Sequence, residues 1–313
     1  MKIRIGTRGS RLALSQAASV RQALLALLPE EDEVELVPIV TKGDRRQDVS
    51  LARLRGRGVF VKEVEQALLE GRVQMAVHSA KDLTSRTPEG LRLGAFPPRQ
   101  DPRDALLRPR GRPPARLEEL PRGARVATGS IRRQAQLRFL RPDLELVDLR
   151  GNVETRLKRL DAGEFDALVL AVAGLARLGV ADRAWTVLEP DVLLPAVGQG
   201  ALAVEIRDEP GPVAEWAGRL DDPETAVCVG VEREFLATFG GGCEVPLAAL
   251  ARLSPGGSHV SLVARALDPA GGSQLEERAT APREEWRGLG RQVAERLIGR
   301  GALELVGRRD RRA

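Results

Sequence analysis

The stretch VFVKEVEQALLEGRVQMAVHS, residues 59–79, decides the fold class. Its first part, 59–71, places apolar residues at helical spacing and ends at a glycine. Its second part, VQMAVHS at 73–79, is a short apolar run typical of a buried strand. The neighbouring elements that we expect are strands at 2–6 and 34–41 and a helix at 15–28. Because strands that alternate with helices form βαβ units, the first hundred residues predict a parallel sheet.

The same alternation of strands and helices restarts after residue 123. It predicts strands at 124–128, 144–149 and 166–171, and helices at 130–140, 153–160 and 171–179. The segment between the two series, 97–123, is rich in Pro, Arg and Gly, and we expect it to be a crossover. A second α/β domain is therefore predicted.

A Pro/Gly hinge, LPAVGQG at 194–200, follows the second series. The apolar strand after it, 201–206, is expected to return to the first sheet and to make the first domain discontinuous. DDPET at 221–225 has the composition of a helix N-cap and begins a third unit, with a strand at 259–267 and a closing helix at 283–299. The predicted domains are 1–99 with 200–218, then 104–194, then a smaller α+β domain at 221–313.

Composition describes a soluble globular protein, with 42% hydrophobic and 30% charged residues among 313. No apolar run approaches the roughly 20 residues that cross a bilayer. The N-terminus begins as a strand without an apolar signal core, so we expect a cytoplasmic protein that binds no membrane. Two cysteines and two histidines predict neither a disulfide framework nor a zinc site.

Positive charge is concentrated in one part of the chain. Residues 124–160 hold nine basic and four acidic residues, an excess equal to the net charge of +5 of the whole chain. This distribution favours a local site for an anionic ligand over a generally basic protein.

Two strand-to-helix junctions in this region carry arginines. ATGSIRRQ at 127–134 places Arg132 and Arg133 in a first helical turn, behind Thr128 and Ser130. Helix N-termini and guanidinium groups both bind anions, although a Ser-capped helix with solvated arginines remains the alternative. LRGNVETR at 149–156 repeats the arrangement with Arg150 and Arg156, and Asn152 fits an ordinary N-cap as well. Because such junctions meet at one edge of an α/β sheet, they predict a ligand with several negative groups.

HSAKD, 78–82, ends the buried strand of the first domain with Lys81 and Asp82. A carboxylate there can stabilise a cation or transfer protons. From this stretch alone we favour the structural alternative, in which His78 is a satisfied core residue and Asp82 a cap. The loops GTRGS (6–10) and RLRGRGVF (53–60) match no phosphate-binding motif. We expect them either to bring Arg8, Ser10, Arg53 and Arg57 to the crevice or to be solvated basic loops.

Cys243 stands in FLATFGGGCEVPL, 235–247, directly after three glycines. A nucleophilic thiol needs a base, and the chain has few histidines. A structural role is the alternative, and it fits Cys228 in ETAVCVG well. The glycines argue that Cys243 approaches something bulky or moves.

In chain order, the motifs resemble those of the porphobilinogen deaminase (hydroxymethylbilane synthase) family from about residue 3 to the end. They are IGTRGSRLALSQA, VTKGD, GRGVFVKEVEQALL, AVHSAKDL, DPRDA, ATGSIRRQAQL, RGNVETRL, LAVAGLARLG, LPAVGQGALAVE and GGGCEVP. The resemblance implies two periplasmic-binding-protein-like α/β domains around a cleft, plus a smaller C-terminal α+β domain. It also implies a monomeric transferase of tetrapyrrole and heme biosynthesis. Such an enzyme joins four porphobilinogen molecules head to tail, with loss of ammonia, onto a dipyrromethane cofactor. Hydrolysis then releases hydroxymethylbilane for the next enzyme of the pathway.

The resemblance also assigns roles to residues. It implies that Cys243 carries the dipyrromethane through a thioether and that Asp82 is catalytic. Cofactor-binding residues would be Lys81, Ser79, Thr128, Ser130, Arg132, Arg133, Arg150, Arg156 and Gly174. Substrate-binding residues would be Arg8, Ser10, Gln16, Arg150, Arg156, Arg177 and Gln199. A loop over the site would contribute Arg53, Arg57 and Phe60.

This sequence departs from the family pattern in two places. Arg53 and Arg57 stand where lysines are common and Arg55 where a small residue is common, and these changes keep or add charge but alter geometry. Gly129 stands where a serine is common, so one hydroxyl is missing.

Two other functions are alternatives to the enzyme that the resemblance implies. A non-catalytic anion-binding module would not need Asp82 together with Cys243. A nucleic-acid binder is suggested by the sequence pI of about 9.8. It is disfavoured by the 3% aromatic content, which leaves few side chains for base stacking, so no nucleic-acid partner is expected.

Overall fold

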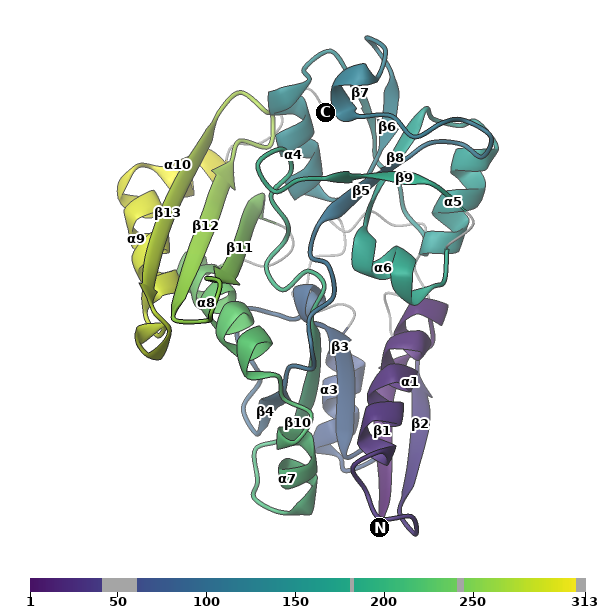
Figure 1. Cartoon of the computed structure of the whole chain (residues 1–313), viewed down its shortest axis with the longest axis vertical. Coiled ribbons are helices and arrows are strands. Elements are labelled where there is room, and N and C mark those ends of the chain that lie inside the picture. The colour runs from purple at the N-terminus through teal and green to yellow at the C-terminus, as the bar shows by residue number, and fades with distance from the viewer. Residues whose placement is uncertain (41–60, 181–182, 241–244, 308–313) are drawn as a thin grey trace.

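Three sheets organise the computed structural model, which describes residues 1–40, 61–180, 183–240 and 245–307. Figure 1 shows the first sheet at the N-terminal end of the molecule, the second at the opposite end, and the third to one side with the C-terminal helices. The two α/β domains and the smaller C-terminal α+β domain of the predicted fold class are confirmed. The exact domain limits stay a prediction.

The first sheet has the strand order β2-β1-β3-β10-β4. Its strands are β1 (Lys2–Arg8), β2 (Glu33–Ile39), β3 (Met75–Ser79), β4 (Leu91–Ala95) and β10 (Leu202–Arg207). β1 pairs in parallel with β2 and β3, whereas β10 is antiparallel to β3 and β4. The return of 201–206 to this sheet is thus confirmed. The parallel arrangement predicted from the first hundred residues is confirmed for β1, β2 and β3, whereas β10, which re-enters from the second domain, runs in the opposite direction to its neighbours.

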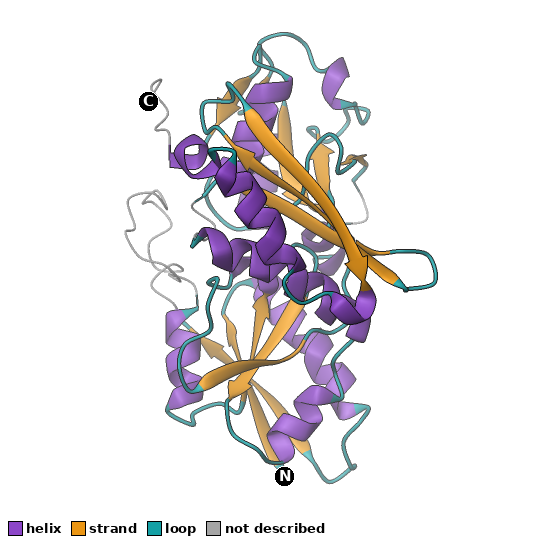
Figure 2. Ribbon diagram, turned by 90° about the vertical axis from the view of Figure 1, so that its left-hand side faces the viewer, coloured by secondary structure: helices purple, strands orange, loops and turns teal. Residues whose placement is uncertain are grey.

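Helices cover both faces of this sheet, as Figure 2 also shows near the N-terminus. They are α1 (Arg11–Leu25), α3 (Lys62–Leu69) and α7 (Pro212–Gly218). α1 and α7 pack on one face, against Ile5 and Met75 among others, and α3 packs on the other, against Ala76. α1 begins four residues earlier than predicted because Ser10 caps it, its hydroxyl accepting from Ala13 N at 3.3 Å. Burial on both faces explains why the central strands β3 and β10 are mostly apolar.

The second sheet has the order β7-β6-β8-β5-β9. Its strands are β5 (Asp104–Leu107), β6 (Arg125–Ala127), β7 (Glu145–Val147), β8 (Ala167–Ala171) and β9 (Trp185–Leu188), and its helices are α4 (Ile131–Leu140), α5 (Val153–Asp161) and α6 (Val172–Arg177). β5 lies inside the segment 97–123, so the prediction of a crossover is wrong for these four residues. A strand so short carries no visible period, and the proline- and arginine-rich flanks hide it.

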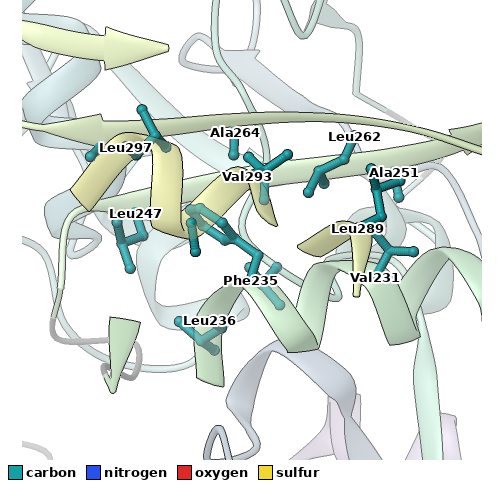
Figure 3. Close-up of a cluster of buried hydrophobic side chains, with 14 of the residues drawn as sticks. Val231, Phe235, Leu236, Leu247, Ala251, Leu262, Ala264, Leu289, Val293 and Leu297 are labelled. Carbon is teal, nitrogen blue, oxygen red and sulfur yellow. The ribbon is translucent and has the colours of Figure 1, made fainter. Parts of the chain in front are cut away.

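The third sheet is an antiparallel meander of β11 (Leu247–Leu253), β12 (His259–Leu267) and β13 (Gln274–Pro282). Its helices are α8 (Pro223–Phe239), α9 (Leu289–Gly299) and α10 (Ala302–Gly307). Figure 3 shows Phe235 of α8 among aliphatic side chains of α9 and the sheet. Gly290 lets the helices touch, since a Cβ there would lie 2.1 Å from Val231 O. The predicted helix from 283 begins only at Leu289, after the 3₁₀ turn Arg283–Glu285.

The C-terminal domain is tied to the rest of the molecule by one buried carboxylate. Glu232 of α8 pairs with Arg99, which precedes the second domain, at 2.7 Å and accepts the N–H of Gly198 at 2.6 Å. It also accepts from Ala251 N in β11 at 2.8 Å. Asp222 caps α8 as predicted, accepting from Thr225 N. None of the helices in the described ranges has both the length and the apolar character needed to cross a bilayer.

Candidate active site

An open pocket with about 390 Å³ of empty space lies at the carboxyl ends of β1 and β3. Its walls come from the start of α1, the start of α3 and the 3₁₀ turn η1 (Ala80–Asp82) after β3. The lining residues are Arg8, Ser10, Leu12, Ala13, Gln16, Val61, Val77, His78, Ser79 and Asp82. Five of the predicted site residues therefore share one pocket, at the edge of an α/β sheet where ligands bind.

Asp82 and Lys81 are adjacent in η1, and both side chains are half-buried. Burial first, and then the nearby guanidinium of Arg133, lower the pKa of Lys81 to about 8. Its ammonium donates to Gln199 Oε1 at 3.3 Å. Gln199 in turn donates to Asp104 Oδ1 at 2.9 Å, so a polar chain leads from the first domain into the second.

Arg132 and Arg133 of α4 are buried around Asp104, the first residue of β5. Arg132 Nη2 lies 2.8 Å from Asp104 Oδ2, and Arg133 Nη2 lies 2.7 Å from Oδ1. Burial opposes ionisation, but the two guanidinium groups hold the pKa of Asp104 well below its usual range. Further donors of these arginines bond the carbonyl oxygens of Leu194 and Val169. Both arginines are thus held by the carboxylate of Asp104, a residue for which the sequence predicted no role.

Arg150 and Arg156 form the second arginine pair, beside the start of α5. Arg156 Nε donates to Gly151 O at 2.8 Å. Burial, followed by the charges of Arg133 and Arg150, lowers the pKa of Arg156 to about 10, which leaves it cationic at neutral pH. Arg150 lies 3.7 Å from Asp148, and its buried Nε has no hydrogen-bond partner among the described residues. This unused donor and the mutual repulsion of the cations suit an anionic ligand.

The two strand-to-helix junctions touch each other. A Cβ at Gly129 would lie 2.5 Å from Leu149 O, so only glycine fits this approach without a shift. Asn152 caps α5, accepting from Thr155 N at 2.8 Å. Ser130 occupies the N-cap position of α4 without a side-chain cap bond, and Thr128 Oγ1 accepts from Ser130 N at 3.4 Å. The hydroxyl of Ser130 therefore stays available to a ligand.

The remaining predicted residues lie where the two α/β domains meet. Gln16 Nε2 donates to Ser79 Oγ at 2.8 Å. Arg177 Nη2 donates to Gly200 O at 2.7 Å, while its own carbonyl oxygen accepts from Ser15 Oγ. A Cβ at Gly174 would lie 3.9 Å from Leu12 of α1, an ordinary contact. Cys243, Arg53, Arg55, Arg57 and Phe60 lie outside the described residues.

His78 and Cys228 are both buried core residues, the structural alternative that the sequence allowed for each of them. His78 is buried with its Nε2 3.0 Å from Glu205 Oε2. Cys228 is buried, and burial followed by the charge of Glu232 raises the pKa of its thiol to about 11, so it is not a reactive thiolate. Within the described ranges no group of His, Cys, Asp or Glu is arranged to hold a metal ion.

Asp104, Glu232 and Arg99 are the polar residues that sequence reasoning missed. A partial signal was present, because Asp104 is the second acidic residue of the quoted DPRDA motif and directly precedes an apolar run. Its partners are 28 and 29 residues away in the chain, so the pairing itself is visible only in three dimensions.

Comparisons with known proteins agree with this geometry. Residues 3–215 match the family model described as porphobilinogen deaminase, dipyromethane cofactor binding domain, and residues 226–299 match the one described as porphobilinogen deaminase, C-terminal domain. The porphobilinogen deaminase of Syntrophotalea carbinolica is 49% identical, over 97% of this chain and 95% of its own. That of Syntrophobacter fumaroxidans is 46% identical, over 97% and 96%. Among solved structures, an ancestral cationic amino acid solute binding protein has a TM-score of 0.43 and 16% identity, over 70% of this chain and 87% of its own.

Proposed function

The chain belongs to the porphobilinogen deaminase family, and on this premise we propose that it joins porphobilinogen units head to tail with release of ammonia. The observation that carries the proposal is the pocket of Asp82, with Lys81 beside it and arginines of the second domain close enough to shift the pKa of Lys81. Porphobilinogen carries an acetate, a propionate and an aminomethyl group. A site for it therefore needs cations for the carboxylates and an anion for the reacting centre.

Asp82 is proposed as the catalytic residue. Loss of ammonia from the aminomethyl group leaves a cationic methylene-pyrrole, which a carboxylate beside the pocket stabilises electrostatically. When a pyrrole carbon then attacks the methylene, the ring proton displaced from that carbon passes to the Asp82 carboxylate. Asp82 returns this proton to solvent, where the ammonia released in the first step takes it up as ammonium. Each condensation thus forms one carbon–carbon bond, breaks one carbon–nitrogen bond and releases ammonium.

The arginines are proposed to act in two ways. Arg150 and Arg156 bind carboxylates directly. The buried Nε of Arg150 has no hydrogen-bond partner among the described residues, and the charges of Arg133 and Arg150 repel that of Arg156. Arg132 and Arg133 act at longer range. Their two guanidinium groups share one carboxylate, that of Asp104, so the group keeps one net positive charge that attracts an anionic ligand. Thr128, Ser130 and Lys81 complete the cofactor side. Ser79 and Gly174 are also proposed to bind the cofactor. The proposed substrate side consists of Arg8, Ser10, Gln16, Arg177 and Gln199.

These residues fit a dipyrromethane, whose four carboxylates need several cations in one place. When bound, this group would supply a pyrrole carbon as the nucleophile that starts the chain. We propose that it is attached through a thioether to Cys243. The family model described as a cofactor binding domain supports the cofactor itself and covers residues 3–215. The attachment to Cys243 rests on the resemblance of GGGCEVP to the motif of the family. α8 ends at Phe239, and β11 begins at Leu247 on the same domain.

The setting of the enzyme is proposed from the same family membership. Porphobilinogen is the substrate, and hydroxymethylbilane is released to the next enzyme of tetrapyrrole biosynthesis. We expect a cytoplasmic monomer whose loop with Arg53, Arg57 and Phe60 contributes to the site.

The mass of the denatured, freshly purified protein tests the cofactor. We expect a covalent adduct of two pyrrole units on the wild type and none on Cys243→Ser, with Cys228→Ser as the matched control that keeps the adduct. An unmodified mass on active wild-type protein would overturn the attachment.

Turnover of porphobilinogen by Asp82→Asn tests the catalytic assignment. We expect the adduct and the fold to remain while kcat falls by about 10²–10⁴-fold, the usual range for a lost proton-transfer group. The control is Asp208→Asn, a carboxylate 64% exposed and far from the pocket lining. Near-normal kcat in Asp82→Asn would show that another group does the chemistry.

A further inference from the structure

Three ionisable side chains are buried on elements that pack against one another, β3, β10 and α3, and one of them, His78, lines the pocket. His78 of β3, Glu205 of β10 and Glu65 of α3 are 5%, 1% and 7% exposed. His78 Nε2 lies 3.0 Å from Glu205 Oε2. In the antiparallel register His78 is opposite Ala203 and Glu205 is opposite Ala76, so both side chains leave the sheet on one face.

Helix α3 covers this same face and reaches the pocket. Its buried residues pack with Ala76 in one core cluster and include Val64, Ala67 and Leu68. Val61, one turn before Glu65, lines the pocket together with His78 and Asp82. The ionisable cluster therefore lies between α3 and the sheet, directly behind two walls of the pocket.

We propose that Glu65, His78 and Glu205 form a proton-sharing cluster that holds α3 against the sheet, and that turnover requires its protonated state. The proposal rests on the function proposed above, because it concerns the pocket of Asp82. The three residues act through Val61 and the end of β3, not on the reacting atoms. They are positioning residues.

The physical reason is the cost of burying two like charges. His78 bonds one carboxylate, that of Glu205, and a second buried carboxylate repels the first. Burial, and then the charge of Glu205, raise the pKa of Glu65 to about 7, while His78 and Lys62 oppose the shift. From α8, Arg233 also faces Glu205. Above neutral pH, Glu65 gains a charge that pushes α3 away from β10, and Val61 moves with it.

Histidine NMR can test the cluster directly, because the chain has only two histidines. The second, His259, is exposed and serves as an internal reference. In wild-type protein we expect the ring nitrogens of His78 to report an ionisation between about pH 6 and about pH 9. In Glu65→Gln, which keeps the shape but cannot ionise, this transition should be absent while that of His259 is unchanged.

The matched control is Glu70→Gln, the same chemical change at the exposed end of α3. It should leave the His78 transition as in the wild type. If Glu65→Gln also leaves that transition unchanged, or if His78 reports no ionisation in the wild type, the proposal is wrong.

The pH dependence of kcat/KM for porphobilinogen tests the link to turnover. The ratio of Glu65→Gln to wild type should rise at least about fivefold from pH 6 to pH 9, because only the wild type loses the proton. The same ratio for Glu70→Gln should stay flat. A flat ratio for Glu65→Gln would overturn the requirement for protonation.

The two readouts separate this proposal from the proposed function. If the wild type shows no turnover of porphobilinogen, the proposed function fails, and the NMR titration still decides whether the cluster shares a proton. If the wild type turns over and the NMR transition is missing, the proposed function stands and the cluster fails.

Discussion

Asp104 determines what Arg132 and Arg133 can do at the scale of single residues. The sequence predicts both arginines as carboxylate ligands, and the structure holds both on an internal carboxylate. Together, Asp104, Arg132 and Arg133 carry one net positive charge. The carboxylate of Asp104 holds in place two guanidinium groups that would otherwise repel each other. Asp104 thereby allows a high density of arginine at one edge of the sheet.

Asp104→Asn should destabilise the protein by about 3–5 kcal/mol, because it leaves two buried guanidinium groups without a counter-charge. Urea unfolding measures the loss. The exposed Asp208→Asn, which breaks only the ion pair with Arg92, should lose much less. Equal losses in the two variants would contradict the role given to Asp104.

The pH dependence of that loss has a definite sign. Since the folded-state pKa of Asp104 is lowered, its stabilisation is present above the unfolded pKa of about 3.9 and is lost as pH falls towards the folded value. The difference in unfolding free energy between wild type and Asp104→Asn should be constant from about pH 5 to about pH 8 and shrink below about pH 4. A difference that grows in acid would contradict the assignment.

Gly129→Ala should separate the two arginine junctions, because the added Cβ meets Leu149 O. We expect a loss of about 1–3 kcal/mol in unfolding free energy and a higher KM for porphobilinogen. Gly218→Ala in α7 is the matched control, since nothing lies within 4 Å of its Cβ position. It should be neutral or slightly stabilising. An unchanged KM in Gly129→Ala would mean that the spacing of the junctions does not matter for binding.

Helix α8 is the element that joins the C-terminal domain to the rest of the molecule. Its start at the Asp222 cap follows from the sequence, and its apolar side chains contribute to the core shown in Figure 3. Glu232, with no exposed surface, instead accepts bonds from three other segments, including Arg99. Glu232 therefore fixes α8 to Arg99, at the end of the first domain, and to Gly198 in the hinge between the domains.

Glu232→Gln should weaken this junction by about 3–5 kcal/mol, since Arg99 loses its buried counter-charge. Thermal unfolding followed by the fluorescence of Trp286, which packs on this domain, measures the loss. Glu224→Gln, in the exposed first turn of the same helix, is the control and should change little. If both variants unfold alike, the junction does not depend on Glu232.

Charge distribution is the feature that concerns the whole molecule. Lys81 comes from the first domain and Arg133, Arg150 and Arg156 from the second. After burial, the charge of Arg133 lowers the pKa of Lys81, and the charges of Arg133 and Arg150 lower the pKa of Arg156. An anion between the domains would relieve this repulsion and hold the domains together. Binding and stability are therefore linked.

Cys243→Ser, which should lack the cofactor, is expected to unfold at a lower temperature than the wild type. Inorganic sulfate should raise its unfolding temperature by about 3–5 °C more than it raises that of the wild type. The double variant with Arg150→Gln should respond less, because one cation is missing. An equal response of wild type and Cys243→Ser would show that the site is not an unsatisfied cationic centre.

The elements that the sequence predicted correctly are those with a strong local signal. The core strands β3 and β12 and the helices α4, α5 and α8 follow from hydrophobic period, capping residues and terminal glycines. β5 and β9 are four-residue strands, and β13 is half-exposed, so their sequences carry little periodicity. β5 and β9 form through pairing with each other across about 80 residues of chain, and β13 forms by pairing with β12 directly before it, and no local pattern encodes these pairings.

The sequence by itself determined the α/β class, the third domain, the family and the candidate residues at strand ends. These properties depend on local periodicity and on ordered motifs. Only the tertiary structure decided that β10 reverses into the first sheet, that Asp104 occupies Arg132 and Arg133, and that Glu65 lies buried beside His78 and Glu205. Each of these outcomes depends on which distant segments share a buried surface. Burial there decides which charges need a partner and which can serve a ligand.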